Sequence, residues 1–129
     1  MLLASCGRRQ EAKSIIKDFM KANVEDYSKV SYLEFYDVDS TRNISDSLIQ
    51  VLHARTPAHF SRNISYQQRD GKTLWLLRTR YLMDKDTCSA TFYMDKEMTG
   101  VVAFKELCYS TYRPRKAGDL ILFFLEQFP

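Results

Sequence analysis

The sequence predicts an α+β domain in which an N-terminal helix packs on a four-stranded antiparallel sheet that ends in a β-meander. Three observations predict this class. An amphipathic helical repeat fills the N-terminal part of the chain. Three β-type segments separated by short polar turns follow Asp70-Gly71. Finally, 45% of the 129 residues are hydrophobic, which is enough for the core of one domain.

The first predicted helix covers residues 11–24. Its apolar residues recur at the spacing of one helix face and comprise Ala12, Ile15, Ile16, Phe19 and Met20. β-branched and aromatic residues over positions 30–38 predict the first strand. Because an antiparallel sheet commonly buries one face, we expect the helix to cover that face.

A short second helix is predicted after a turn-like cluster at residues 39–43. Ser45 is its expected N-cap, since a serine hydroxyl can accept a hydrogen bond from the first helical turn. Pro57 closes this helix, and residues 56–63 are expected to form a loop.

The second half of the chain predicts the meander. Strands are expected over residues 73–83, 87–94 and 101–107, with turns at 84–86 and 95–100.

Two of the three cysteines lie on the last two of these strands. Cys88 and Cys108 are equally far from a turn centred near Met98, so they are expected to face each other across the hairpin. Opposite residues of a non-hydrogen-bonded pair bring their Cβ atoms within ~4.5–5.5 Å, close to disulfide reach. Two interpretations stay open, a disulfide or two half-buried thiols that act as small hydrophobic residues.

The third cysteine completes a lipobox-like sequence, Leu3-Ala4-Ser5-Cys6. In this interpretation Cys6 is acylated and begins the mature protein, and membrane lipid is its partner. A secretory signal is longer than the segment before Cys6, so the interpretation takes Met1 as an internal or misassigned start; the alternative is a chance match. We thus divide the chain into a lipobox remnant and tether (1–10), an α+β domain (11–108), and a basic linker with an apolar C-terminal segment (109–129).

The apolar C-terminal segment can end the sheet or contact another surface. Phe123, Phe124 and Phe128 are the candidate interface residues, for a homodimer or for a membrane surface.

A candidate ligand face combines cationic and aromatic residues of strand 73–83, namely Arg78, Arg80, Trp75 and Tyr81, because such side chains stack on rings and bind anions. In the alternative interpretation Trp75 and Tyr81 belong to the core, while Arg78 and Arg80 lie on the solvated face and pair with Glu106 or Asp95.

Catalytic, metal and cofactor sites are not predicted. The glycines match no phosphate-binding loop, and His53 and His59 are too far apart for usual helical ligand spacing. A nucleophilic pair of Cys88 or Cys108 with either histidine is not favoured, because no residue order selects one. The net charge of +3 does not indicate nucleic acid binding.

Three segments carry a family resemblance: residues 23–28, 35–41 and 91–95. Over roughly residues 3–107 the layout resembles small uncharacterised bacterial lipoproteins of Gram-negative gut bacteria. The resemblance implies a cystatin-like or NTF2-like domain on the cell envelope and brings no catalytic residues.

The sequence thus favours a membrane-anchored lipoprotein of the bacterial cell envelope, periplasmic or surface-facing, that binds an unknown protein or small molecule without catalysis. Two alternatives stay open. One is a cytoplasmic NTF2-like pocket protein or enzyme, and the other is a structural subunit that docks through its apolar C-terminus.

Overall fold

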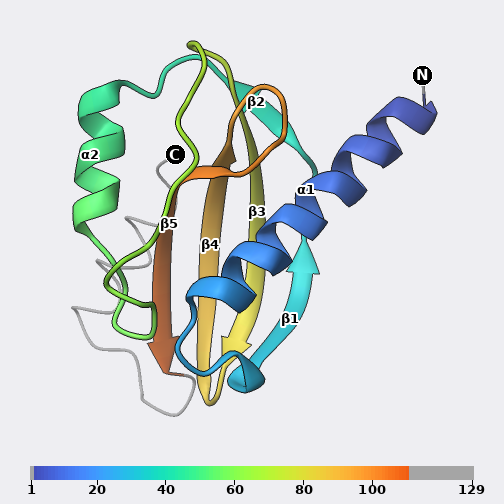
Figure 1. The fold of residues 1–129 in the computed structure, drawn as a ribbon. Coiled ribbons are helices and arrows are strands. Elements are labelled where there is room, and N and C mark those ends of the chain that lie inside the picture. Colours follow the sequence, from blue (N-terminus) through green and yellow to red (C-terminus); the bar gives the residue numbers. More distant parts are fainter. Residues whose placement is uncertain (1, 111–129) are drawn as a thin grey trace.

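The structure, a computed structural model, describes the backbone of residues 2–110 and the side chains of residues 7–109 (Figure 1). Its centre is an antiparallel sheet in the order β1-β3-β4-β5, with β2 also paired to β3. The elements in chain order are α1 (Leu2–Asn23), the 3₁₀ turn η1 (Tyr27–Lys29), β1 (Val30–Phe35), β2 (Asp39–Thr41), α2 (Asp46–Ala54), β3 (Leu74–Met83), β4 (Asp86–Met94) and β5 (Val101–Ser110).

The sheet has five described strands where the sequence predicted four. Residues 39–41, expected as part of a turn, form the short strand β2. The chain leaves β1 at Phe35 and continues along the same edge of β3, where the Tyr36 amide donates to the Arg78 carbonyl at 2.9 Å. The polar composition of residues 39–41 gives them a weak β propensity, so the sequence did not predict this strand. It forms because pairing with β3 compensates for that weak propensity.

Helix α1 crosses one face of the sheet, which we call the inner face (Figure 1). The predicted apolar stripe is confirmed, since Ala12, Ile16 and Met20 are fully buried and Phe19 is 8% exposed. They pack against inward residues of the sheet, including Leu77, Tyr81, Cys88, Ala90, Phe92 and Phe104. The expected N-terminal helix on an antiparallel sheet is therefore confirmed.

Helix α1 begins earlier than the sequence predicted. Residues 7–10, expected as a tether, continue the helix back toward Leu2. Arginine favours helices, and both arginines of this segment contact the domain. The Arg9 Nη2 atom donates to the Phe35 carbonyl at 2.7 Å, and the Arg8 guanidinium lies 4.3 Å from the centre of the Trp75 ring.

Helix α2 begins as predicted, with the Ser45 hydroxyl accepting a hydrogen bond from the Leu48 amide at 3.1 Å. Its buried residues Ile49 and Leu52 pack in a second core cluster on the opposite, outer face of the sheet. The other members of that cluster are Ile44, Leu74, Tyr93, Val102 and Ala103. The sheet therefore carries apolar contacts on both faces.

The β5 edge of the sheet is covered along part of its length. The His53 ring donates from Nε2 to the Val102 carbonyl at 2.7 Å, and the Gln67 amide donates to the Val101 carbonyl at 2.8 Å. Covered carbonyls cannot pair with another chain, so this part of the edge is protected from strand addition.

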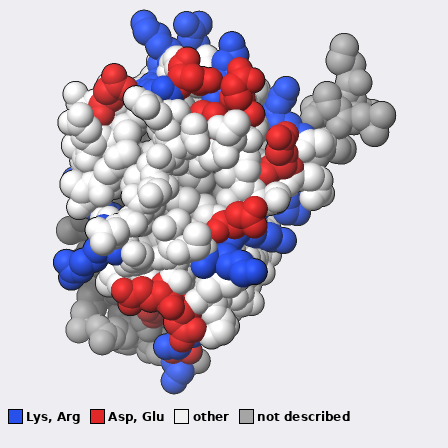
Figure 2. Space-filling view, in the orientation of Figure 1, with Lys and Arg blue, Asp and Glu red and all other residues white. Residues whose placement is uncertain are grey.

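Charged side chains on the face seen in Figure 2 lie mostly around its rim, with both signs interspersed, and the centre carries few of them. This face shows no single basic patch of the kind that binds a phosphate backbone.

Candidate functional site

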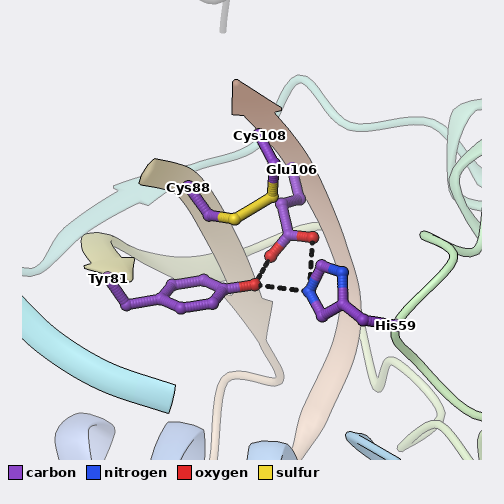
Figure 3. The surroundings of a disulfide bond; sticks show 5 residues. All are labelled: His59, Tyr81, Cys88, Glu106 and Cys108. Atoms are coloured by element: carbon purple, nitrogen blue, oxygen red, sulfur yellow. Dashed lines mark hydrogen bonds and ion pairs between the residues drawn. A yellow bond between two sulfur atoms is a disulfide. The ribbon is translucent and has the colours of Figure 1, made fainter. Parts of the chain in front are cut away.

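The strongest concentration of chemically active side chains lies on the inner face, around the cysteine pair (Figure 3). Cys88 and Cys108 are register partners on β4 and β5, as their spacing from the turn predicts, and a disulfide joins them with their Cα atoms 4.0 Å apart. Tyr81, Glu106 and His59 surround this bond. We call these five residues the disulfide cluster.

Strand alternation places four members of the disulfide cluster side by side. Tyr81 of β3 pairs with Cys88, which pairs with Cys108, so the three form one row across the sheet. Glu106 lies two residues before Cys108 and therefore points to the same face. Its partner on β4 is Ala90, whose small side chain leaves room for the Glu106 carboxylate to reach across to Tyr81.

His59 comes from the loop after α2, and the backbone fixes its position. The Glu25 amide donates to the His59 carbonyl at 3.0 Å, and the next residue, Phe60, is 1% exposed within the inner core. The Phe60 amide also closes a turn onto the Pro57 carbonyl at 3.0 Å. Burial of Phe60 thus anchors the loop and directs the imidazole toward β3 and β5.

One hydrogen-bonded chain links the three polar side chains. The Tyr81 hydroxyl donates to Glu106 Oε1, and His59 Nε2 lies 2.9 Å from that hydroxyl. His59 Nε2 is also 3.1 Å from Glu106 Oε2, close enough for an ion pair with a protonated imidazole. Oε2 nevertheless has no hydrogen bond of good geometry among the described residues.

Burial dominates the electrostatics of Glu106. Its side chain is only 1% exposed, whereas that of His59 is 19% exposed. Burial raises the pKa of the Glu106 carboxyl, and the hydrogen bond and charge of His59 oppose part of that rise.

The four possible metal-ligating residues of the disulfide cluster also converge. One ligand atom each from His59, Cys88, Glu106 and Cys108 lies within 4.8 Å of every other. A metal site at this position was not predicted from the sequence. The ligands come from three separate segments, and no short motif joins them.

The expected ligand face is divided between the two sides of the sheet. Tyr81 is fully buried on the inner face, and Trp75 is partly buried and packs against the same inner core. Arg78 and Arg80 alternate with them and therefore point to the outer face. The four residues thus form no common surface, because neighbouring positions of a strand face opposite sides.

The expected partners of the two arginines are engaged elsewhere. Glu106 belongs to the disulfide cluster on the other face. Asp95 is 2% exposed and accepts hydrogen bonds from the Thr99 and Gly100 amides at 2.8 and 3.0 Å, which hold the β4–β5 turn.

The proposed interface residues and the proposed lipidation site have no described side chains. Phe123, Phe124 and Phe128 lie beyond the described residues. Cys6 falls within α1, but its side chain is not among those described.

Open clefts adjoin both ends of α2. One of ≈ 760 Å³ lies beside the end of α2 and is lined by Glu25, His53, Ala54, Thr56, Pro57, Ala58, Phe60 and Arg62. Another of ≈ 490 Å³ adjoins the start of α2, where Arg69 is already bound to the carbonyls of Ile44, Gly71 and Lys72.

The sequence indicated Glu106 only as a possible partner of Arg78 or Arg80, and it did not distinguish His59 from His53. Alternation with Cys108 was the available signal for Glu106, since residues two apart on a strand share a face. No pattern in the sequence places the loop of His59 over the inner face.

Comparison of the chain with protein-family models, with curated proteins and with solved structures finds no match. Among the described residues, the structure contains no helix with the length and apolar character needed to cross a membrane.

Proposed function

We propose that this chain is the folded domain of a lipid-anchored protein of the bacterial cell envelope, and that it acts by binding rather than by catalysis. The observation that carries the proposal is the disulfide between Cys88 and Cys108. Disulfides form and persist in exported proteins and are rare in the cytosol, where thiols are kept reduced. The lipobox-like sequence before Cys6 supports the same compartment.

Contacts of the first described side chains support a short anchor. Arg8 lies over Trp75 and Arg9 donates to the Phe35 carbonyl, so the chain meets the domain within a helical turn of Cys6. An acyl group on Cys6 would then hold the sheet close to the bilayer. A single acyl chain is not enough for stable anchoring. The diacylglyceryl group of bacterial lipoproteins carries two.

For the finer fold we propose a cystatin-like or NTF2-like relationship. Its support is one long helix laid across one face of an antiparallel sheet whose last three strands form a meander.

Packing between α1 and the sheet favours a binding domain over a pocket protein. A pocket of the NTF2 type needs a cavity between helix and sheet into which polar groups converge. Phe19, Phe92 and Phe104 occupy this space, with ring centres 5.4–5.9 Å apart. Arg78 points to the opposite face, so it cannot serve such a cavity.

Fractionation of the native host tests the anchor. The gene, tagged at its 3′ end and expressed from its own locus, is compared with the Cys6→Ser variant. We expect the unsubstituted protein in the membrane fraction, released by detergent and not by high salt, and the variant lost from that fraction because serine cannot form the thioether to lipid.

Ser5→Ala is the matched control, because alanine is also a small residue and leaves Cys6 available for acylation. It should fractionate like the unsubstituted protein. Recovery of the unsubstituted protein from the cytosol, or equal membrane association of Cys6→Ser, would contradict the proposal.

A further inference from the structure

The disulfide cluster brings together more metal-binding chemistry than a structural disulfide requires. A nitrogen of His59, an oxygen of Glu106 and the sulfurs of Cys88 and Cys108 all lie within 4.8 Å of one another. They approach the same point from the loop after α2, from β4 and from β5 (Figure 3). A structural disulfide needs neither a buried carboxylate nor an imidazole beside it.

The types of donor atom match Zn²⁺. Zinc is bound tetrahedrally by thiolate, imidazole and carboxylate, with Zn–S near ~2.3 Å and Zn–N near ~2.0–2.1 Å. Ligand atoms in such a tetrahedron are therefore roughly 3.3–3.8 Å apart. The 4.8 Å limit on the present separations exceeds this by roughly 1.0–1.5 Å, a distance within the reach of a change of side-chain rotamer.

The disulfide itself blocks this arrangement. Its sulfurs are 2.01 Å apart, much closer than two ligands of one zinc ion, and a disulfide sulfur carries no thiolate charge. Reduction allows the sulfurs to separate while β4 and β5 stay paired on both sides of them.

The surroundings of Glu106 favour a cation at this point. Its carboxylate is almost completely buried, and Oε2 has no well-aligned hydrogen bond among the described residues. Oε1 accepts a hydrogen bond from the Tyr81 hydroxyl, and such hydrogen bonds from residues that do not bind the metal orient metal-binding carboxylates. The His59 side chain, which is 19% exposed, provides a route of entry from solvent.

We propose that reduction of the Cys88–Cys108 disulfide converts the disulfide cluster into a zinc site, with His59, Cys88, Glu106 and Cys108 as ligands. A phosphine reductant and water supply the two electrons and two protons, giving two thiols and the phosphine oxide. Zinc then replaces the two thiol protons, which pass to solvent. Oxidation and metal binding are mutually exclusive states of the same four side chains.

The test uses the full chain carrying Cys6→Ser, so that Cys88 and Cys108 are its only cysteines. Any effect of the reductant or of thiolate ligation then comes from this pair. Zn²⁺ binding is measured by competition with a chromophoric chelator, before and after phosphine reduction. Co²⁺ serves as a spectroscopic probe, because thiolate ligation and tetrahedral geometry each produce a characteristic absorption. We expect one ion per reduced chain and none per oxidised chain.

Ligand variants assign the site. Removing a residue that only hydrogen-bonds to a metal ligand typically weakens metal binding by ~10–100-fold. His59→Ala and Glu106→Gln each remove a ligand, so each should weaken zinc binding by more than that. Tyr81→Phe should fall within that range, since it removes only the hydroxyl that orients Glu106. His53→Ala is the matched control and should bind zinc like the parent, because its ring contacts Tyr66 and the Val102 carbonyl instead.

Circular dichroism determines whether each reduced protein is folded. If the reduced parent loses structure, recovery of the native spectrum with one equivalent of Zn²⁺ supports the proposal, because metal binding then supplies folding free energy. Failure of the reduced parent to bind zinc, folded or not, overturns it. Equal binding by the parent and by both His59→Ala and Glu106→Gln also overturns it.

Discussion

Reduction of the Cys88–Cys108 bond should lower the free energy of unfolding by about 3 kcal/mol. The bond joins residues 20 apart in sequence. In the chain-entropy model a closed loop of ~15 residues contributes ~3 kcal/mol and one of ~100 residues ~4.7 kcal/mol, so this loop contributes about 3.3 kcal/mol. The effect arises because the crosslink restricts the unfolded chain.

The assay is urea unfolding of the Cys6→Ser protein, followed by circular dichroism, with and without a phosphine reductant. A chelator is present in both samples so that metal binding cannot restore stability. With a urea dependence of roughly 1–3 kcal/mol per molar, the midpoint should fall by roughly 1–3 M. Chemical reduction is preferable to substitution, because it leaves every buried atom in place.

The double variant Cys88→Ala/Cys108→Ala provides the matched control, since phosphine should not change its unfolding curve. A change smaller than ~0.5 kcal/mol in the parent, with both thiols shown to be free by titration, would refute the reasoning.

Three further predictions concern local features. Tyr66→Phe should raise the free energy of unfolding by about 1 kcal/mol, because the buried Tyr66 hydroxyl has no hydrogen-bond partner among the described residues. Chemical denaturation that shows a loss of stability instead would contradict this prediction. Burial also raises the pKa of Tyr66 from 10.0 to about 12, so stability that is complete below pH 10.0 should fall as the pH rises toward 12. Tyr66→Phe should lose less stability over that interval than the parent, as measured by urea midpoints at each pH. Ser45→Ala should cost about 1 kcal/mol through loss of the α2 N-cap, whereas Ser47→Ala, within the same helix, should change thermal stability much less.

Local patterns predicted the parts of the fold that depend on neighbouring residues. The helical stripe from Ala12 to Met20 is buried as expected, and the turn centred near Met98 sets the register that pairs Cys88 with Cys108. In both cases the period of the side chains fixes which residues share a face.

Features that depend on tertiary contacts were missed or misplaced. Strand β2 forms because β3 offers pairing partners to residues 39–41, whose own composition is typical of a turn. Helix α1 extends through Arg8 and Arg9 because the domain supplies an aromatic ring and a carbonyl to them. Likewise, the burial of Phe60 and the Glu25 hydrogen bond to the His59 carbonyl place His59 beside Glu106, although the two residues are 47 positions apart in the sequence.

Peptide mass spectrometry of the protein isolated from its native host, without reduction, tests the central claim most directly. The account predicts a mature N-terminal peptide that begins at Cys6 and carries a thioether-linked diacylglyceryl group, together with a crosslinked peptide pair joining Cys88 to Cys108. An unmodified Cys6 thiol on a protein whose other two cysteines are also free would contradict both the anchor and the oxidising compartment.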